Sequence, residues 1–156
     1  MVKVNFVGAT FKTEKKSGIG VVIQDDQGVV LASLSKLLPQ NHNPLKIEML
    51  VASTAVQFAS ELGFSNIALE GDSHVLMQAI IHDRPFLSLD GLLIDDLRFN
   101  ARCFNQLHYS HIRRECNMVA HRLSRYTLNV LEFVVWMEDV PPQIVSSVLA
   151  DITGLT

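Results

Sequence analysis

The chain has few charged residues and no long apolar run. Charged residues make up 19% of its 156 residues and hydrophobic residues 48%, which excludes the charge-rich composition of a disordered chain. No apolar run approaches the roughly 18 uncharged residues that a membrane helix needs. The N-terminus alternates in polarity and carries Lys3, unlike a secretory signal. We therefore expect one soluble, intracellular domain over residues 1–156, with no membrane partner and one sizeable core.

Cysteine and basic residues are also scarce. Cys103 and Cys116 lack metal-ligand spacing and the density of a disulfide scaffold, so we expect two reduced, inert thiols. The formal net charge is −3. Because phosphate contacts supply much of the affinity for nucleic acids, this balance predicts that any such binding is modest and salt-sensitive. Short basic clusters do occur, at Lys12, Lys15 and Lys16 and at Arg113, Arg114, Arg122 and Arg125.

Hydrophobic patterning predicts three strands at the start of the chain, over residues 2–9, 18–24 and 29–35. A helix is expected from Pro44, capped by Asn43, to about Leu62, where Gly63 would end it. The later expected segments are a strand over 66–69, a helix over 73–81, a break at 82–85, a helix over 92–104, a strand over 106–113 and a helix from 117 to about 133. Residues 133–156 are expected to form a C-terminal extension, with a short helix, packed on the outside.

This order of elements predicts an α/β fold with a five-stranded mixed sheet. The first three strands would be antiparallel, the later two parallel to the first, and helices would cover both faces. In such sheets, chemistry usually lies beyond the carboxyl ends of the parallel strands. Val7, Asp72 and the start of the last long helix all approach that edge, and Glu48 could bring a second carboxylate to it.

These candidate residues also have purely structural interpretations. Asp72 or Ser73 could cap the helix that follows, and Glu48 could pair with Lys46 or an arginine. Two neighbouring acids without a cation would raise the pKa of one of them. Strand alternation could turn Glu70 toward the same face as Asp72, or Glu70 could be an exposed residue at a strand end.

A phosphate site is a further possibility at the start of the last long helix. Arg114 and Asn117 could hold a phosphate there, or Asn117 could cap the helix while Arg114 is solvated. Among the histidines, His74 has the pattern of a surface residue, and His108 and His111 flank Tyr109 in a strand, which favours structural roles, although His111 could approach the edge of the site.

Six segments of the chain resemble, in their order and spacing, those of ribonuclease H-like domains, most closely of a plant branch derived from retroelements. They are Asn5-x-Val7-Gly8-Ala9, Gly18-Ile19-Gly20-Val21-Val22, Glu48, Leu69-Glu70-Gly71-Asp72-Ser73, Arg114-x-x-Asn117-x-x-Ala120-His121-x-Leu123 and Val135-Trp136-x-x-x-x-Pro141. The resemblance covers nearly the whole chain. It implies a ribonuclease H-like fold and the hydrolysis of RNA in RNA–DNA hybrids by two magnesium ions that carboxylates hold.

The resemblance also assigns roles to individual residues. It places the four metal-site positions at Val7, Glu48, Asp72 and His121. Valine cannot ligate a metal, whereas a neutral imidazole can ligate one or shuttle a proton. We therefore expect one weak Mg²⁺ or Mn²⁺ site at most, held by Glu48 and Asp72 with Glu70 as a substitute ligand, and hydrolysis that is lost or strongly weakened.

The same resemblance implies contacts to nucleic acid, with the turn at Lys15 facing the minor groove of a hybrid. The residues implied are Gly8, Lys15, Lys16, Ser73, Arg114 and Asn117. Three hypotheses stay open: a weak manganese-dependent nuclease, a module that binds RNA–DNA hybrid or RNA without cutting it, and a protein-interaction domain, which the acidic net charge favours slightly. A monomer is expected in each case.

Overall fold

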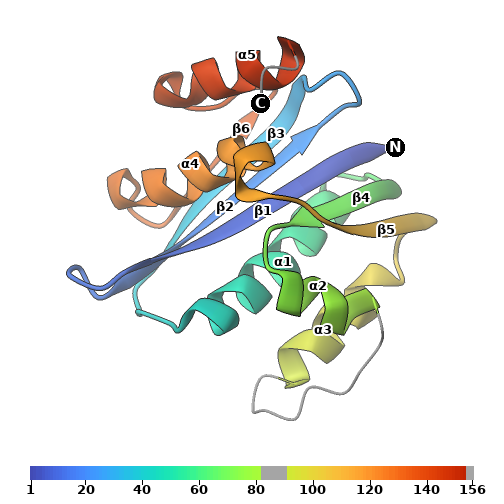
Figure 1. Cartoon of the computed structure of the whole chain (residues 1–156), viewed down its shortest axis with the longest axis horizontal. Coiled ribbons are helices and arrows are strands. Elements are labelled where there is room, and N and C mark those ends of the chain that lie inside the picture. The colour runs from blue at the N-terminus through green and yellow to red at the C-terminus, as the bar shows by residue number, and fades with distance from the viewer. Residues whose placement is uncertain (82–90, 154–156) are drawn as a thin grey trace.

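A computed structural model describes residues 1–81 and 91–153 of the chain and shows a twisted sheet between two layers of helices (Figure 1). The strands are β1 (Val2–Phe11), β2 (Lys16–Gln24), β3 (Val30–Leu38), β4 (Asn66–Gly71), β5 (Gln106–His111) and β6 (Phe133–Met137). The α-helices are α1 (Pro44–Glu61), α2 (His74–Ile81), α3 (Gly91–Ala101), α4 (Met118–Tyr126) and α5 (Val145–Thr153). Short 3₁₀ turns are η1 (Arg114–Cys116), η2 (Thr127–Asn129) and η3 (Pro142–Ile144). The break expected at 82–85 lies outside the described residues.

The strands are ordered β5-β4-β1-β2-β3-β6. β1, β2 and β3 form an antiparallel meander, and β4 and β5 continue the sheet parallel to β1. The predicted α/β fold with a mixed sheet is thereby confirmed. Because the parallel strands end at one edge, the segment after β4 and the segment after β5 lie close together.

The prediction of five strands is wrong, because β6 adds a sixth. This strand pairs antiparallel with β3, with Trp136 opposite Ser33. The helix expected to reach residue 133 ends instead at Tyr126, where the Thr127 hydroxyl donates to the Ser124 carbonyl (2.6 Å) and a 3₁₀ turn follows. The β-branched and aromatic run Phe133–Met137 suits a strand better than a helix.

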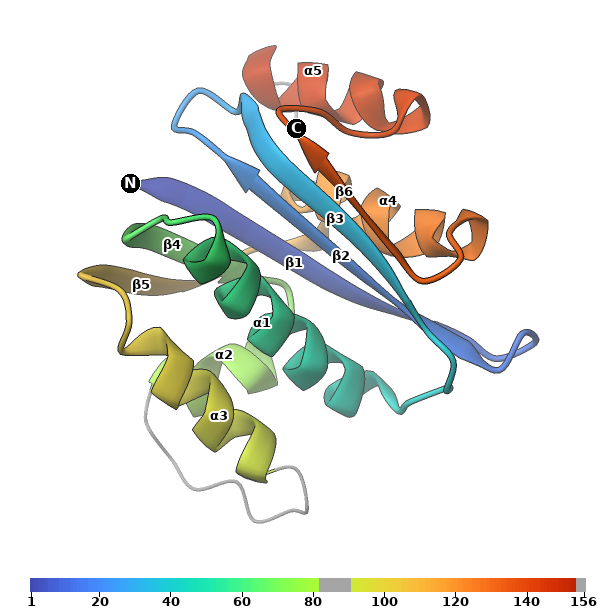
Figure 2. The ribbon, with the colours of Figure 1, turned by 180° about the vertical axis from the view of Figure 1, so that it is seen from behind.

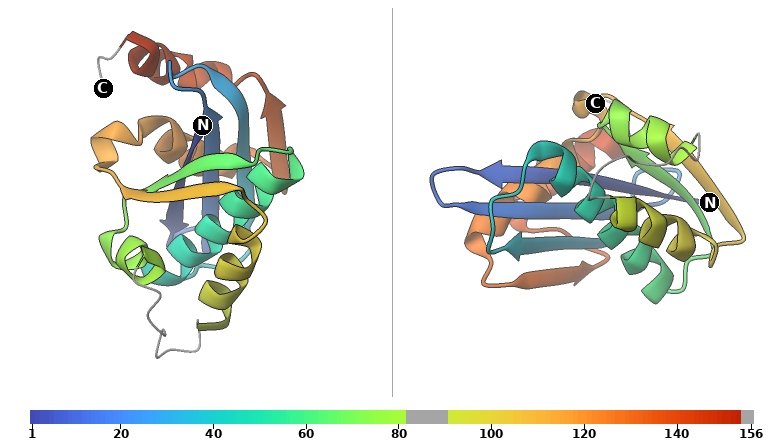
Figure 3. Two further views of the ribbon diagram at one scale, coloured as in Figure 1. Left: turned by 90° about the vertical axis from the view of Figure 1, so that its right-hand side faces the viewer. Right: turned by 90° about the horizontal axis from the view of Figure 1, so that it is seen from below.

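The two faces of the sheet bury separate apolar clusters. α1 packs on one face, with α3 against it, and α4 covers β1 and β2 on the other, as Figures 2 and 3 show from behind, from the side and from below. Glycine at position 20 brings α4 close to β2, because a Cβ there would collide with the backbone of α4 at Ala120 and Ser124. The position of α4 over β1 is therefore set by direct contact between backbones.

The boundaries of α1 follow the expected signals. The Asn43 side chain accepts a hydrogen bond from the Lys46 amide (2.8 Å), Pro44 occupies the first turn, and Gly63 ends the helix with a φ of +85°. The helix buries a stripe that includes Ile47 and Val51, with Glu48 beside it. Across the described ranges, no helix is both long and apolar enough to cross a membrane.

Candidate functional site

Val7 lies in an apolar environment on the α4 side of β1. Alternation along the strand turns Phe6 toward α1 and Val7 toward α4. The Val7 side chain is 1% exposed and belongs to the apolar cluster that contains Ala120 and Leu123 of α4. At the position that the resemblance assigns to the first acid, the structure therefore places a buried aliphatic side chain instead of an oxygen ligand.

Glu48 reaches the same edge of the sheet from the first turns of α1. Its Oε1 accepts a hydrogen bond from the Gly8 amide (3.1 Å), and its Oε2 is buried without a hydrogen-bond partner among the described residues. Burial and then the negative charge of Asp72 raise the pKa of Glu48 from 4.5 to about 8, against the opposing effects of the Gly8 amide and Arg114. The charge of Asp72 thus acts in the expected direction, although burial is the larger cause of the shift in pKa.

Asp72 directly follows β4 and faces η1. Its Oδ2 lies 3.6 Å from Nε of Arg114, and that oxygen accepts no hydrogen bond from the residues that the structure describes. Ser73, rather than Asp72, accepts a long 3.4 Å hydrogen bond from the Leu76 amide in the first turn of α2. His111 Nε2 contacts the Asp72 carbonyl oxygen at 3.3 Å. Asp72, His111 and Arg114 line one open cavity of about 510 Å³.

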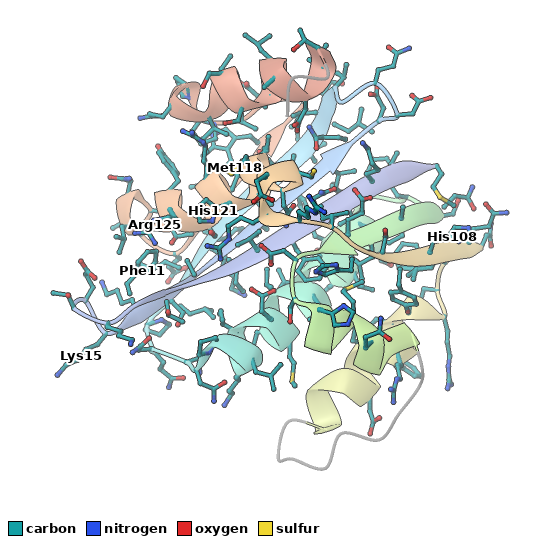
Figure 4. The ribbon with its side chains drawn as sticks, in the orientation of Figure 1. Phe11, Lys15, His108, Met118, His121 and Arg125 are labelled. Carbon is teal, nitrogen blue, oxygen red and sulfur yellow. The ribbon has the colours of Figure 1, made fainter. Side chains whose placement is uncertain are left out.

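His121 lies on α4 and is half-buried (Figure 4). Its Nδ1 is buried and has no hydrogen-bond partner within the described part of the chain. Burial lowers the pKa of His121, the positive charges of Arg114 and Arg125 lower it further, and Asp72 opposes them. The neutral imidazole is therefore favoured, which leaves a nitrogen lone pair available.

Glu70 lies apart from Glu48 and Asp72. It forms a hydrogen bond with the Asn5 side chain and lines a different cavity, together with Asn5 and Lys3. Burial raises the pKa of Glu70, and Lys3 and the Asn5 hydrogen bond act in the opposite direction. The described residues contain no group of three His, Cys, Asp or Glu side chains placed to hold a metal ion.

The fit to a metal centre follows from these donors. Glu48 Oε2 and Asp72 Oδ2 are buried carboxylate oxygens that accept no hydrogen bond from the described residues, and Asp72 Oδ2 lies 3.6 Å from Arg114 Nε. Carboxylate oxygens are the ligand type that Mg²⁺ prefers, and these two residues offer ligands for one cation at most. A two-ion centre needs more oxygen ligands than these two residues and the apolar Val7 environment offer, so the residues present do not fit it.

The residues expected to contact nucleic acid are spread along β1 and around η1. Lys15 lies at the β1–β2 turn with a φ of +57°, and Lys16 begins β2; both are exposed. Arg114 is exposed next to Asp72. Asn117 is buried: it accepts a hydrogen bond from Asn5 (3.0 Å), donates one to the Phe6 carbonyl (3.1 Å), and does not cap α4. The nucleic-acid roles of these residues stay predictions.

Two arginines of α4 received no individual role from the sequence. Arg122 and Arg125 line a cavity with His121, and the Arg125 guanidinium lies 5.3 Å from the centre of the Phe11 ring. The spacing of residues 121, 122 and 125 places them on neighbouring turns of one helix, and this is the signal that sequence analysis could have used. His111 also reaches the Asp72 cavity, although the strand pattern favoured a structural role for it.

Comparisons with known proteins agree with this geometry. The family model described as reverse transcriptase-like matches residues 5–127. Comparison with curated proteins finds no match. Ribonuclease H1 from the archaeon Halobacterium salinarum superposes with a TM-score of 0.75 at 21% identity, over 82% of this chain and 97% of that one.

Two further solved structures are similar. The N-terminal RNase H domain of a Mycobacterium tuberculosis protein has a TM-score of 0.73 at 20% identity, over 82% of this chain and 93% of that one. LC11-RNase H1, crystallised with an RNA/DNA hybrid, has a TM-score of 0.69 at 18% identity, over 83% of this chain and 97% of that one. At these identities the likeness shows the fold. With the family match over most of its length, the chain belongs to the reverse transcriptase-like family and has the ribonuclease H fold.

Proposed function

We propose that this chain is a ribonuclease H-type domain that binds RNA–DNA hybrids, or RNA, and whose ability to hydrolyse RNA is lost or strongly weakened. The binding part is supported by the fold and by a similar ribonuclease H1 that was crystallised with a hybrid. One observation carries the catalytic part: Val7, where the resemblance implies the first acid, is 1% exposed and packs among aliphatic side chains.

The remaining polar residues support binding better than cutting. Glu48 and Asp72 would hold a single Mg²⁺ or Mn²⁺ ion through their free oxygens, and such an ion would supply positive charge next to a phosphate. Arg114 supplies a positive charge at the same place without a metal. Each tenfold loss in rate corresponds to about 1.4 kcal/mol of transition-state stabilisation, and loss of a whole ion should cost several such factors.

The test is cleavage of an end-labelled RNA–DNA hybrid in Mg²⁺ and in Mn²⁺ by the native protein and by Val7→Asp, with circular dichroism to establish that the variant folds. We expect the native protein to be inactive or very slow and Val7→Asp to cut. If the native protein already cuts and Asp72→Asn abolishes the activity, the inactive interpretation is wrong and the protein is a weak nuclease. If neither cuts, the loss extends beyond Val7.

A specific surface favours the second candidate, a protein-interaction module. The edge strand β6 and the segment before it expose large apolar side chains: Leu131 is 97% exposed, Phe133 58% and Met137 59%. Exposed apolar strand edges are common sites of protein association. Hybrid affinity separates the two candidates, because a nucleic-acid module binds hybrid with an affinity that falls as salt rises, whereas a protein-interaction module does not require hybrid binding.

A further inference from the structure

The open cavity lined by Asp72, His111 and Arg114 forms a cleft at the edge of the sheet. A second cavity, of about 420 Å³, lies beside α4 and has a different set of lining residues. Its volume lies within the usual range of roughly 300–1,000 Å³ for small-molecule sites. Its polar lining is contributed by two consecutive turns of α4 and by the segments that follow them: His121, Arg122, Arg125, Tyr126, Asn129 and Gln143. Among the residues that the structure describes, no carboxylate lines it. The cavity therefore offers hydrogen-bond donors and positive charge.

The two arginines are free to bind an external anion. Arg122 and Arg125 are exposed, and neither forms an ion pair with any residue in the described ranges. Guanidinium groups bind phosphate through paired N–H donors, which makes arginine the usual partner of phosphate. Two of them three residues apart on a helix can act on one phosphate group.

Arg125 and Tyr126 are held in place by aromatic contacts. The Arg125 guanidinium stacks 5.3 Å from the centre of the buried Phe11 ring, and the Tyr126 ring meets the Trp136 ring edge-on at 5.8 Å. Such contacts restrict the side chains before a ligand arrives, which lowers the entropy lost on binding. Tyr126 and Ile144 add an apolar wall on which a base can stack.

We propose that this cavity binds one nucleotide of a nucleic-acid strand that leaves the cleft, with its phosphate at Arg122 and Arg125 and its base against Tyr126. The proposal deepens the proposed function and rests on it for the identity of the strand. Figure 4 shows His121, Arg125, Phe11 and Lys15 following one another along α4 and β1 toward the β1–β2 turn. A strand on this path passes the cavity beside His121 and Arg125 before it reaches Lys15.

The experiment measures binding of a fluorescently labelled RNA–DNA hybrid that carries a single-stranded overhang, by anisotropy at several salt concentrations. Arg122→Gln and Arg125→Gln should each weaken binding about three- to tenfold and lower the slope of log K against log salt by about 0.7–0.9. Arg125→Lys, which keeps the charge, should recover part of the loss and rule out an effect of Phe11 packing alone.

Lys36→Gln is the matched control. It removes the same charge from β3 on the opposite, α1 face of the sheet, where Lys36 lies with Thr54 and Phe58. Hybrid affinity and salt slope should not change in this variant. Unchanged binding in both arginine variants, or an equal loss in Lys36→Gln, would overturn the proposal while leaving the proposed function intact.

A second experiment tests binding in the cavity without a nucleic-acid strand. Titration of AMP, followed by NMR shifts of the Tyr126 ring and α4 amides, should show weak saturable binding that Arg122→Gln removes. If the native protein fails to bind hybrid, the proposed function is wrong and the AMP titration alone decides the cavity. If AMP moves no α4 signal and hybrid affinity is independent of Arg122, the cavity is not a nucleotide site.

Discussion

At the scale of single residues, the edge of the sheet brings two carboxyl groups together with little to offset their negative charge when both are ionised. Glu48 and Asp72 each keep a buried oxygen without a hydrogen bond within the described chain, and only Arg114 lies close enough to offset them. A protein that held no cation here would be less stable whenever both acids are ionised. Protonation of Glu48 removes one of the two negative charges, and its raised pKa of about 8 places this change in an accessible pH range.

Glu48 should make the protein less stable as pH rises. Between pH 4.5 and about 8 the folded state binds the Glu48 proton more tightly than the unfolded state, so the free energy of unfolding falls by up to about 1.4 kcal/mol per pH unit. Glu48→Gln should remove this decline, and its advantage over the native protein should vanish below pH 4.5. Urea denaturation at several pH values measures the free energy of unfolding of the native protein and of the variant. Glu61→Gln, an exposed change on the same helix, should leave the decline in place.

Val7→Asp should destabilise the metal-free protein, because it buries a carboxylate in an apolar cluster. We expect a loss of about 3 kcal/mol in the free energy of unfolding. Millimolar Mn²⁺ should restore much of it, since an ion that binds only the folded state adds stability in proportion to the logarithm of its concentration. Differential scanning calorimetry with and without Mn²⁺ measures both effects. Val7→Asn is the control, because it adds a polar side chain without a carboxylate. If Mn²⁺ stabilised Val7→Asn as much as Val7→Asp, the aspartate would not be acting as a metal ligand.

At the scale of secondary-structure elements, close contact between α4 and β2 fixes where His121 and the cavity lie. A Cβ at Gly20 would meet the backbone of α4 at Ala120 and Ser124, and α4 cannot yield without moving away from β1. The Ser35 hydroxyl strengthens the contact by donating to the Leu123 carbonyl (2.7 Å). The helix is therefore attached to the sheet by its backbone as well as by its apolar side chains.

Gly20→Ala should therefore lower the free energy of unfolding by about 3 kcal/mol, the upper part of the usual range for overpacking. Gly63→Ala is a useful comparison, because nothing lies within 4 Å of its would-be Cβ and only its φ of +85° disfavours alanine. That variant should lose roughly 1 kcal/mol. Urea denaturation ranks the two. A loss in Gly20→Ala no larger than that in Gly63→Ala would mean that α4 can move.

Sequence patterns predicted those elements whose signals are local. Asn43, Pro44 and Gly63 mark the ends of α1 by their own conformational preferences, and all three act as expected. β6 was missed because residues 133–137 become a strand only through pairing with β3, a contact that lies about a hundred residues away along the chain. The arginine cavity was missed for the same reason, since it forms where α4 meets Gln143 and Ile144.

The candidate cleft was predictable in part. The end of a parallel strand placed Asp72 at the correct edge, and helical spacing brought Glu48 to it. Burial was not predictable: Asn117 occupies the N-cap position of α4, yet its side chain bonds inward to Asn5 and Phe6. Glu70 interacts with Asn5 instead, because Ile67 and Leu69 fill the α1 side of β4 and Glu70 therefore points to the other face, away from Glu48.

At the scale of the whole molecule, the acidic net charge of −3 hides an uneven distribution. Exposed basic residues occur on the α4 side of the molecule, at Arg114 of η1 and at Arg122 and Arg125 of α4, and at the β1–β2 turn, at Lys15 and Lys16. Binding of a polyanion should therefore be confined to this side of the molecule and should weaken quickly as salt rises.

Lys15→Gln and Lys16→Gln should each weaken hybrid binding a few-fold, irrespective of base sequence, and each should reduce the salt slope by about 0.9. Fluorescence anisotropy on two hybrids of unrelated sequence tests this prediction. A loss confined to one sequence would indicate base readout, and no loss at all would place the turn outside the contact surface.

The exposed edge of β6 bears on how the protein avoids aggregation. If two copies joined their β6 strands antiparallel about Val135, Phe133 would face Met137, and Glu132 of each copy would face Glu138 of the other. Like charges opposite each other disfavour that pairing, so the two glutamates act as gatekeepers at the ends of an otherwise uncharged strand. Under this pairing, two carboxylates at the ends of β6 oppose edge-to-edge association of the folded domain, whatever the free energy of unfolding.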